Sequence, residues 1–138
     1  MQPVITKESP LGADLLQLMQ RHTADMHADT PPESIYMMDA GQPVAMGAFK
    51  RLDATHAEIK SMHVLAEARG HGLSRLMLAH LIAEAKAAGL NRLSLETGIQ
   101  PTFVAARALY ANAGFATCLA FEGYWNDPNS VFMTRELA

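Results

Sequence analysis

Residues 67–74 read Glu-Ala-Arg-Gly-His-Gly-Leu-Ser, and this stretch decides the fold of the 138-residue chain. It follows a strand predicted over Ala57–Leu65 and runs directly into a helix predicted over Leu73–Ala88. A glycine-rich turn at a helix start presents several unpaired backbone N–H groups, backed by the positive end of the helix dipole. Gly70 and Gly72 permit positive φ and let a ligand approach the backbone closely. The stretch therefore predicts a phosphate or pyrophosphate site, with a plain strand-to-helix turn as the alternative.

Arg69 supports the phosphate interpretation because its guanidinium is a flanking cation suited to phosphate oxygens. Two other phosphate loops are absent from the sequence, since it contains neither G-x-x-x-x-G-K-[ST] nor G-x-G-x-x-G. A P-loop nucleotide hydrolase and a dinucleotide-binding domain are therefore disfavoured.

Length and composition predict one globular domain over residues 1–138, with 49% hydrophobic and 18% charged residues. No run of 18 apolar residues and no secretory signal are present, so we expect neither a membrane partner nor export. The single cysteine, Cys118, excludes an internal disulfide and suits the cytoplasm. We interpret Cys118 as a small apolar strand residue rather than a nucleophile.

The charge pattern argues against nucleic acid as a partner. The net charge is −3 and no cluster of five basic residues occurs, whereas nucleic-acid binding normally requires a concentrated positive surface. The six histidines show neither H-x-x-H nor H-E-x-x-H spacing, so no metal site is expected. The weakly acidic balance mildly favours a cationic substrate such as an amine.

The order of predicted elements indicates a mixed α/β sheet. Helical spacing on the later helix places one apolar stripe at Leu73, Leu76, Met77, Leu81 and Ala85, with Gly89 as its C-terminal cap. A first helix is expected from Ser9-Pro10 and another over Pro101–Ala113. A hairpin turn is expected at residues 40–43. Strands are expected at Val4–Thr6, Ile35–Asp39, Val44–Leu52, Arg92–Thr97, Phe115–Phe121 and Val131–Leu137.

Two motifs give the chain a resemblance to the GCN5-related N-acetyltransferase (GNAT) family, of the small single-domain bacterial type. Arg69–Ser74 resembles the family's [QR]-x-x-G-x-[GA] loop for the pyrophosphate of acetyl-CoA, although Ser74 stands where glycine or alanine is usual. Ala108–Phe115 resembles the last eight positions of the family's A-x-x-L-Y-x-x-x-G-F segment. The resemblance covers nearly the full length and implies the GNAT fold, a central, mixed but mostly antiparallel sheet flanked by about four helices.

The resemblance also implies the chemistry of acetyl transfer from acetyl-CoA, the acyl-donor cosubstrate, to an amine in a ternary complex. The attacking amine must lose a proton, the oxyanion must be stabilised, and the departing thiolate is better protonated. By its place in the second motif, Tyr110 is the expected general acid for the thiolate. The alternative for Tyr110 is an amphipathic helix residue that packs its ring and leaves the hydroxyl at the rim.

Glu58 is the expected general base for the amine, because related histone-type enzymes carry a glutamate at the matching place. Strand alternation puts Glu58 on one face with Lys60, Met62 and Val64. A solvated glutamate, or one paired with Lys60 or Arg51, is the alternative. Glu96 is a second carboxylate that could reach the same cleft, and a water relay would need no dedicated base.

The cosubstrate contacts implied by the resemblance run from the end of one strand into the next helix. Backbone N–H groups at Met62–Val64 would stabilise the oxyanion and hold the pantetheine, while the loop would hold the pyrophosphate. His71 is expected to fill the loop at its exposed surface, and Arg75 is expected either to assist or to be solvated. The full expected set is Met62, His63, Val64, Arg69, Gly70, His71, Gly72, Leu73, Ser74 and Arg75.

For the acceptor, Glu33, Glu96 and Tyr124 are the expected contacts, the last in a loop that a structural or subunit role would explain equally well. The sequence therefore predicts an N-acetyltransferase that acts on a primary amine of a small or amino-acid-like molecule, and the family leads us to expect a homodimer. Two alternatives stay open: a non-catalytic acyl-CoA-binding or protein-interaction module, and a protein or peptide N-acetyltransferase.

Overall fold

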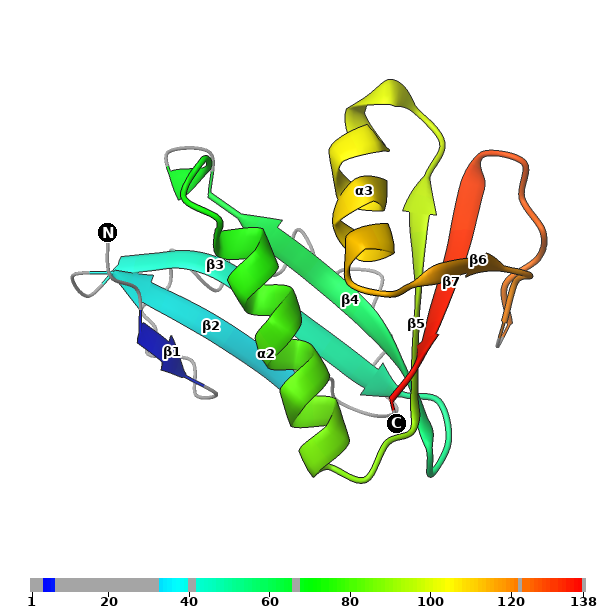
Figure 1. Cartoon of the computed structure of the whole chain (residues 1–138), viewed down its shortest axis with the longest axis horizontal. Helices are drawn as coiled ribbons and strands as arrows, with labels where there is room; N and C mark the ends of the chain where they lie inside the picture. The colour runs from blue at the N-terminus through cyan, green and yellow to red at the C-terminus, as the bar shows by residue number, and fades with distance from the viewer. Residues whose placement is uncertain (1–3, 7–32, 40–41, 66–67, 122, 138) are drawn as a thin grey trace. The chain divides into compact units, whose positions relative to one another are not determined.

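The computed structural model describes residues 4–6, 33–39, 42–65, 68–121 and 123–137 (Figure 1). The helix expected from Ser9 and part of the turn at residues 40–43 lie outside the described residues. The elements are β1 (Val4–Thr6), β2 (Glu33–Asp39), β3 (Gln42–Arg51), β4 (His56–Val64), α2 (Leu73–Ala87), β5 (Arg92–Gly98), the 3₁₀ helix η2 (Pro101–Phe103), α3 (Val104–Asn112), β6 (Ala116–Cys118) and β7 (Ser130–Glu136).

The chain divides into two compact units. The first contains Met1–Lys50 and Lys60–Leu81, and the second contains Arg51–Ile59 and Ile82–Ala138. Strands β3 and β4 and helix α2 contribute residues to each unit, because the boundaries fall inside these three elements.

The first unit holds strands in the order β1-β2-β3-β4, with antiparallel pairing of β1 to β2 and of β2 to β3. The β2–β3 register shifts between Met37 and Met38. Strand β3 is buried continuously from Val44 to Phe49, which indicates that both of its faces are covered. One cover is α2, because a Cβ added to Gly47 would lie 2.9 Å from side-chain carbons of Leu81 and Met77.

The second unit holds strands in the order β4-β5-β7-β6. Strand β4 pairs in parallel with β5, from His56 opposite Arg92 to Glu58 opposite Ser94. Strand β7 pairs antiparallel with both β5 and β6. This register places residues of β4, β5 and β7 side by side, which is the arrangement that positions the polar groups described below.

The buried face of α2 differs in part from the predicted stripe. Leu73, Met77, Leu81 and Ala85 are buried as expected, but Leu76 is 51% exposed. Leu76 precedes Leu81 by five residues, so at 3.6 residues per turn the two side chains point about 140° apart. Leu78 and Ile82 are buried instead, because they extend the face that contains Leu81.

Two other elements are shorter than expected. The helix predicted from Pro101 to Ala113 begins as η2 and becomes α-helical only over Val104–Asn112. The strand predicted over Phe115–Phe121 is confined to Ala116–Cys118, because the Ala120 N–H donates to Asn126 Oδ1 (2.9 Å) rather than to a strand. The remaining strands match their predictions to within about two residues.

The expected fold class is confirmed. Among the described strand pairs with an assigned register, only β4 with β5 runs parallel, so the sheet pairing is mixed and mostly antiparallel. The described residues contain the two α-helices α2 and α3 besides η2, fewer than the four or so helices expected over the whole chain. Neither described helix has the length and apolar character needed to cross a membrane.

Candidate functional site

The glycine loop ahead of α2 has the backbone geometry that its sequence predicts. Gly70 has φ of 87° and Gly72 has φ of 73°, both in the left-handed region that favours glycine. No atom lies within 4 Å of the position that a Cβ would take at either residue. The loop backbone is therefore open on the side where those side chains would stand.

Arg69 connects this loop to the strand before it. Its Nε donates to the Val64 carbonyl (3.2 Å), while the side chain as a whole is exposed. Val64 itself is buried, and Met62 and His63 are half-buried. The guanidinium is thus held beside the loop by one nitrogen. All of these residues belong to the first unit.

The start of α2 is electrostatically suited to an anion. The Leu76 N–H donates to the Gly72 carbonyl (3.2 Å). The N–H groups just before Leu76 lie at the helix start, where backbone donors lack intrahelical acceptors. The described first turn carries no acidic side chain, and Arg75 is exposed there. Ser74 is half-buried and His71 is exposed, the latter as expected for a loop residue.

Glu58 is buried in the second unit rather than solvated. It is 4% exposed, and its Oε2 accepts a hydrogen bond from the Tyr124 hydroxyl (2.7 Å), a residue 66 positions later. The expected alternative of a solvent-exposed strand glutamate is therefore wrong, because β4 is covered on both faces at Ala57, Glu58 and Ile59. Arg51, considered above as an ion-pair partner, donates to the Ala88 carbonyl (3.0 Å).

Three further aromatic rings surround the Tyr124–Glu58 pair. The Tyr124 ring lies 5.4 Å from Phe121 and 5.5 Å from Phe132, measured between ring centroids. Phe121 in turn contacts Phe132 at 5.7 Å and His56 at 5.9 Å. Such edge-on and tilted pairs are the favoured geometries for aromatic packing, so the ring of Tyr124 is held from two sides.

Tyr110 lies on α3 and is 8% exposed. Its ring packs against Phe115 at 5.9 Å in an edge-to-face arrangement. Burial raises the pKa of Tyr110 to about 12, because the phenolate would lose its hydration. The hydroxyl is therefore protonated throughout the neutral range.

The helix that carries Tyr110 is fixed to the end of β5. Arg107 donates from the same nitrogen to the carbonyls of Gly98 and Gln100. A Cβ on Gly98 would lie 2.7 Å from the Phe103 ring, so the close approach of η2 to β5 requires glycine there.

The remaining predicted acceptor residues lie in different units. Glu96 of β5 is exposed, and its Oε2 accepts a hydrogen bond from the Ser130 hydroxyl (2.7 Å) in the second unit. Glu33 begins β2 in the first unit, where its backbone pairs with Phe49. Cys118 lies in β6 as expected, and burial raises the pKa of its thiol.

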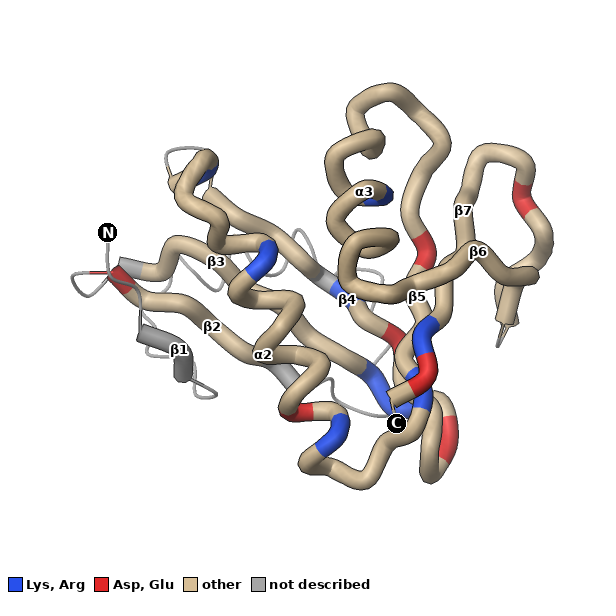
Figure 2. The backbone as a smooth tube through the Cα atoms, in the orientation of Figure 1, with Lys and Arg blue, Asp and Glu red and all other residues tan. Residues whose placement is uncertain are grey.

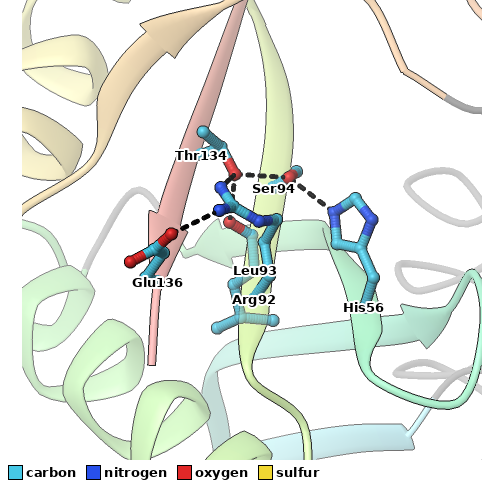
Figure 3. A network of polar contacts seen from close by, with 6 residues as sticks. All are labelled: His56, Arg92, Leu93, Ser94, Thr134 and Glu136. Carbon is cyan, nitrogen blue, oxygen red and sulfur yellow. Dashed lines mark hydrogen bonds and ion pairs between the residues drawn. The ribbon is translucent and has the colours of Figure 1, made fainter. Parts of the chain in front are cut away.

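A second polar network in the second unit joins three strands (Figure 3). His56 Nε2 lies 2.7 Å from Ser94 Oγ, which lies 2.8 Å from Thr134 Oγ1. Arg92 donates to that same threonine oxygen (3.0 Å) and forms an ion pair with Glu136 (2.8 Å). Ser94 is only 1% exposed, so the network accounts for a fully buried hydroxyl.

Where β5 and β7 run together, opposite charges meet (Figure 2), and Arg92 of β5 is paired with Glu136 of β7. No group of three or more metal-ligating side chains occurs among the described residues.

Neither the Tyr124–Glu58 bond nor the His56–Ser94–Thr134 chain was predicted. The only sequence signals were a glutamate and a serine at strand positions whose neighbours are apolar. A polar residue inside a buried strand needs a hydrogen-bond partner, but its spacing does not say which distant residue supplies it.

Comparisons of the sequence and of the structure with known proteins both find acyltransferases. A model of the acetyltransferase (GNAT) family matches residues 5–115. An uncharacterized N-acetyltransferase of Bacillus subtilis (strain 168), YsnE, is 38% identical, with 91% of this chain and 94% of its own covered.

Two solved structures extend the comparison to the fold. A protein of Klebsiella pneumoniae subsp. pneumoniae, provisionally assigned to the acyl-CoA N-acyltransferases, has a TM-score of 0.84 at 30% identity, over 99% of this chain and 98% of its own. A Bacillus subtilis acetyltransferase in complex with CoA has a TM-score of 0.80 over 99% of this chain and 100% of its own. At 15% identity this second likeness concerns the fold alone.

Proposed function

The chain belongs to the GNAT family of acetyltransferases and is therefore an acyltransferase, and from that premise we propose that it transfers an acetyl group from acetyl-CoA to a primary amine of a small, amino-acid-like acceptor. The observation that carries the proposal is the loop Arg69–Ser74. Its two glycines have positive φ and open space beside them, immediately before the N-terminus of α2.

This loop fits the pyrophosphate of acetyl-CoA in shape and in charge. Side chains at positions 70 and 72 would fill the space that a phosphate needs, and glycine leaves that space open. The first N–H groups of α2 and the positive end of its dipole attract an anion. Arg69 and Arg75 add positive charge, and Ser74 adds a hydroxyl that can donate to a phosphate oxygen.

Acetyl-CoA supplies an activated acyl carbon and a thiolate leaving group. Glu58 takes the proton that the amine nitrogen loses, in a buried position where a carboxylate interacts strongly with its neighbours. Backbone N–H groups of Met62–Val64 hold the pantetheine and the carbonyl oxygen of the acetyl group. Glu96 attracts the cationic acceptor, and we expect the reaction to take place in the cytoplasm on a homodimer.

Tyr110 acts on the thiolate chiefly by hydrogen bonding. Burial raises its pKa to about 12, whereas a thiol has a pKa of about 8.5, so complete proton transfer would be uphill by roughly 5 kcal/mol. A phenol that keeps its proton is a dependable donor, and a hydrogen bond to a charged acceptor is worth about 1.5–3 kcal/mol. We therefore assign Tyr110 to stabilising the leaving group, with solvent supplying the proton afterwards.

The first experiment is isothermal titration of the protein with acetyl-CoA and with CoA, repeated on Gly72→Glu. The matched control is Gly89→Glu, because Gly89 has φ of 82° and equally open surroundings at the opposite end of α2. Both variants gain the same charge and the same backbone strain. We expect micromolar binding that is lost in Gly72→Glu and retained in Gly89→Glu.

A screen of small amines by thiol release then tests the transfer itself. Retention of cosubstrate binding in Gly72→Glu would mean that the loop is not the site, and loss in both glycine variants would assign the effect to charge or backbone strain instead of the loop. A well-folded protein that binds neither acetyl-CoA nor CoA would favour the non-catalytic, partner-binding alternative.

A further inference from the structure

The pair formed by Glu58 and Tyr124 has features that acceptor binding does not explain. The carboxylate is 4% exposed, and one of its oxygens is already occupied by the tyrosine hydroxyl at 2.7 Å. The tyrosine ring is half-buried between Phe121 and Phe132. A residue that recognises a cation through its ring would need an open ring face, and this ring is used for packing.

We infer that Tyr124 is a positioning residue for Glu58, which holds the carboxylate ionised and in one orientation so that it can accept the proton of the acceptor amine. The inference rests on the proposed function of Glu58 and reassigns Tyr124 from contact with the acceptor. During transfer the nitrogen–carbon bond forms, the carbon–sulfur bond breaks, and the amine proton passes to the Glu58 carboxylate.

The physical basis is the difference between the two protonation states of a buried carboxyl group. Burial by itself disfavours the charged form, and a base that is protonated at neutral pH cannot accept a proton. A phenol that donates to the carboxylate favours the charged form, and hydrogen bonds to ionised acceptors are stronger than neutral ones. The Tyr124 hydroxyl thus offsets part of the cost of burying Glu58.

The aromatic packing makes this bond directional. Phe132 lies on β7 and is 5% exposed, so it provides a fixed surface for the tyrosine ring. Phe121 fills the other side and also contacts His56, two residues before Glu58 on β4. The loop that carries Tyr124 is therefore packed against the same strand whose carboxylate it holds. The neighbouring Trp125 is 69% exposed and is better placed to meet an acceptor from solvent.

The decisive measurement is the titration of Glu58 by NMR on protein labelled with carbon-13 at the glutamate carboxyl, with Glu58→Gln to assign its resonance. We expect Tyr124→Phe, which keeps the ring and removes the hydroxyl, to raise the titration midpoint of Glu58 by about one pH unit. The other ionisable side chains on the paired strands of the second unit remain in place, namely His56, Arg92, Glu96, Cys118, Arg135 and Glu136. Glu96 and Glu136 serve as internal controls.

Phe121→Leu is the second variant, because it weakens the packing and keeps the hydroxyl. It should move the Glu58 midpoint less than Tyr124→Phe does. In turnover assays near neutral pH, Tyr124→Phe should lower kcat about tenfold with unchanged affinity for acetyl-CoA.

An unchanged Glu58 midpoint in Tyr124→Phe would overturn the inference, as would a raised KM for the acceptor with kcat intact, which is the signature of direct contact. A midpoint that moves equally in Phe121→Leu would assign the effect to packing and also overturn it. The NMR titration needs no activity, so a protein that fails to acetylate amines would refute the proposed function and leave this test standing.

Discussion

Replacing Tyr110 with phenylalanine should change how the stability of the protein depends on pH. The ring is 8% exposed, and burial raises the pKa of the hydroxyl to about 12 from an ordinary value of 10.0. The folded state therefore holds this proton more tightly than the unfolded state does. The stability that this represents is fully present below pH 10 and is lost as the pH rises towards 12.

The size of the effect follows from the two pKa values. Each pH unit between them corresponds to about 1.4 kcal/mol, so the full loss above pH 12 is about 3 kcal/mol. At pH 11, half-way between the two values, the expected loss is about 1.4 kcal/mol. Phenylalanine has no proton to lose, so Tyr110→Phe should lack this contribution while it keeps the packing against Phe115.

Urea unfolding of both proteins at pH 8 and pH 11 measures the difference. Other groups titrate in this range in both proteins, so only the difference between the two changes in unfolding free energy is attributed to Tyr110. We expect the wild type to lose about 1.4 kcal/mol more than the variant. Equal losses would show that the hydroxyl ionises as it does in water, and the argument from burial would be wrong.

Three other substitutions test further parts of the structure. Gly47→Ala should destabilise the protein by about 1–3 kcal/mol in urea unfolding, because its new methyl group would overlap Leu81 at 2.9 Å; an unchanged midpoint would mean that α2 does not pack closely on β3. Ser94→Ala should cost about 1–3 kcal/mol by the same assay, because its two half-buried hydrogen-bond partners, His56 and Thr134, lose the oxygen that they share. Ser130→Ala, at a more exposed bond, is the control and should cost less. Arg107→Ala should lower kcat without changing affinity for acetyl-CoA, because it frees the helix that carries the proposed hydrogen-bond donor; unaltered kcat would argue against a role for this anchor.

Features encoded by short-range patterns were predictable from the sequence. The loop at residues 69–74 was recognisable because two closely spaced glycines between a strand and a helix mark backbone positions that need positive φ. Most strands lie where alternation and turn residues placed them, and family membership is confirmed.

Features that depend on distant residues were not predictable in the same way. Helical spacing alone could not exclude Leu76 from the buried face, since the direction of that face depends on what α2 packs against. The partner of Glu58 lies 66 residues away, in a loop without regular structure, and no local pattern identifies it. Likewise β6 is shorter than predicted because the Ala120 N–H donates to the Asn126 side chain of the following loop instead of to a strand.

The chain of hydroxyl groups across β4, β5 and β7 fixes the direction of its own hydrogen bonds. Arg92 can only donate, and Thr134 uses its single hydrogen on the Leu93 carbonyl (3.2 Å), so Thr134 accepts from Ser94. Ser94 then has no hydrogen left and must accept from His56, whose Nε2 therefore carries a proton. A histidine in this tautomer takes up its second proton on the other ring nitrogen, so the three strands keep this link whether His56 is neutral or charged.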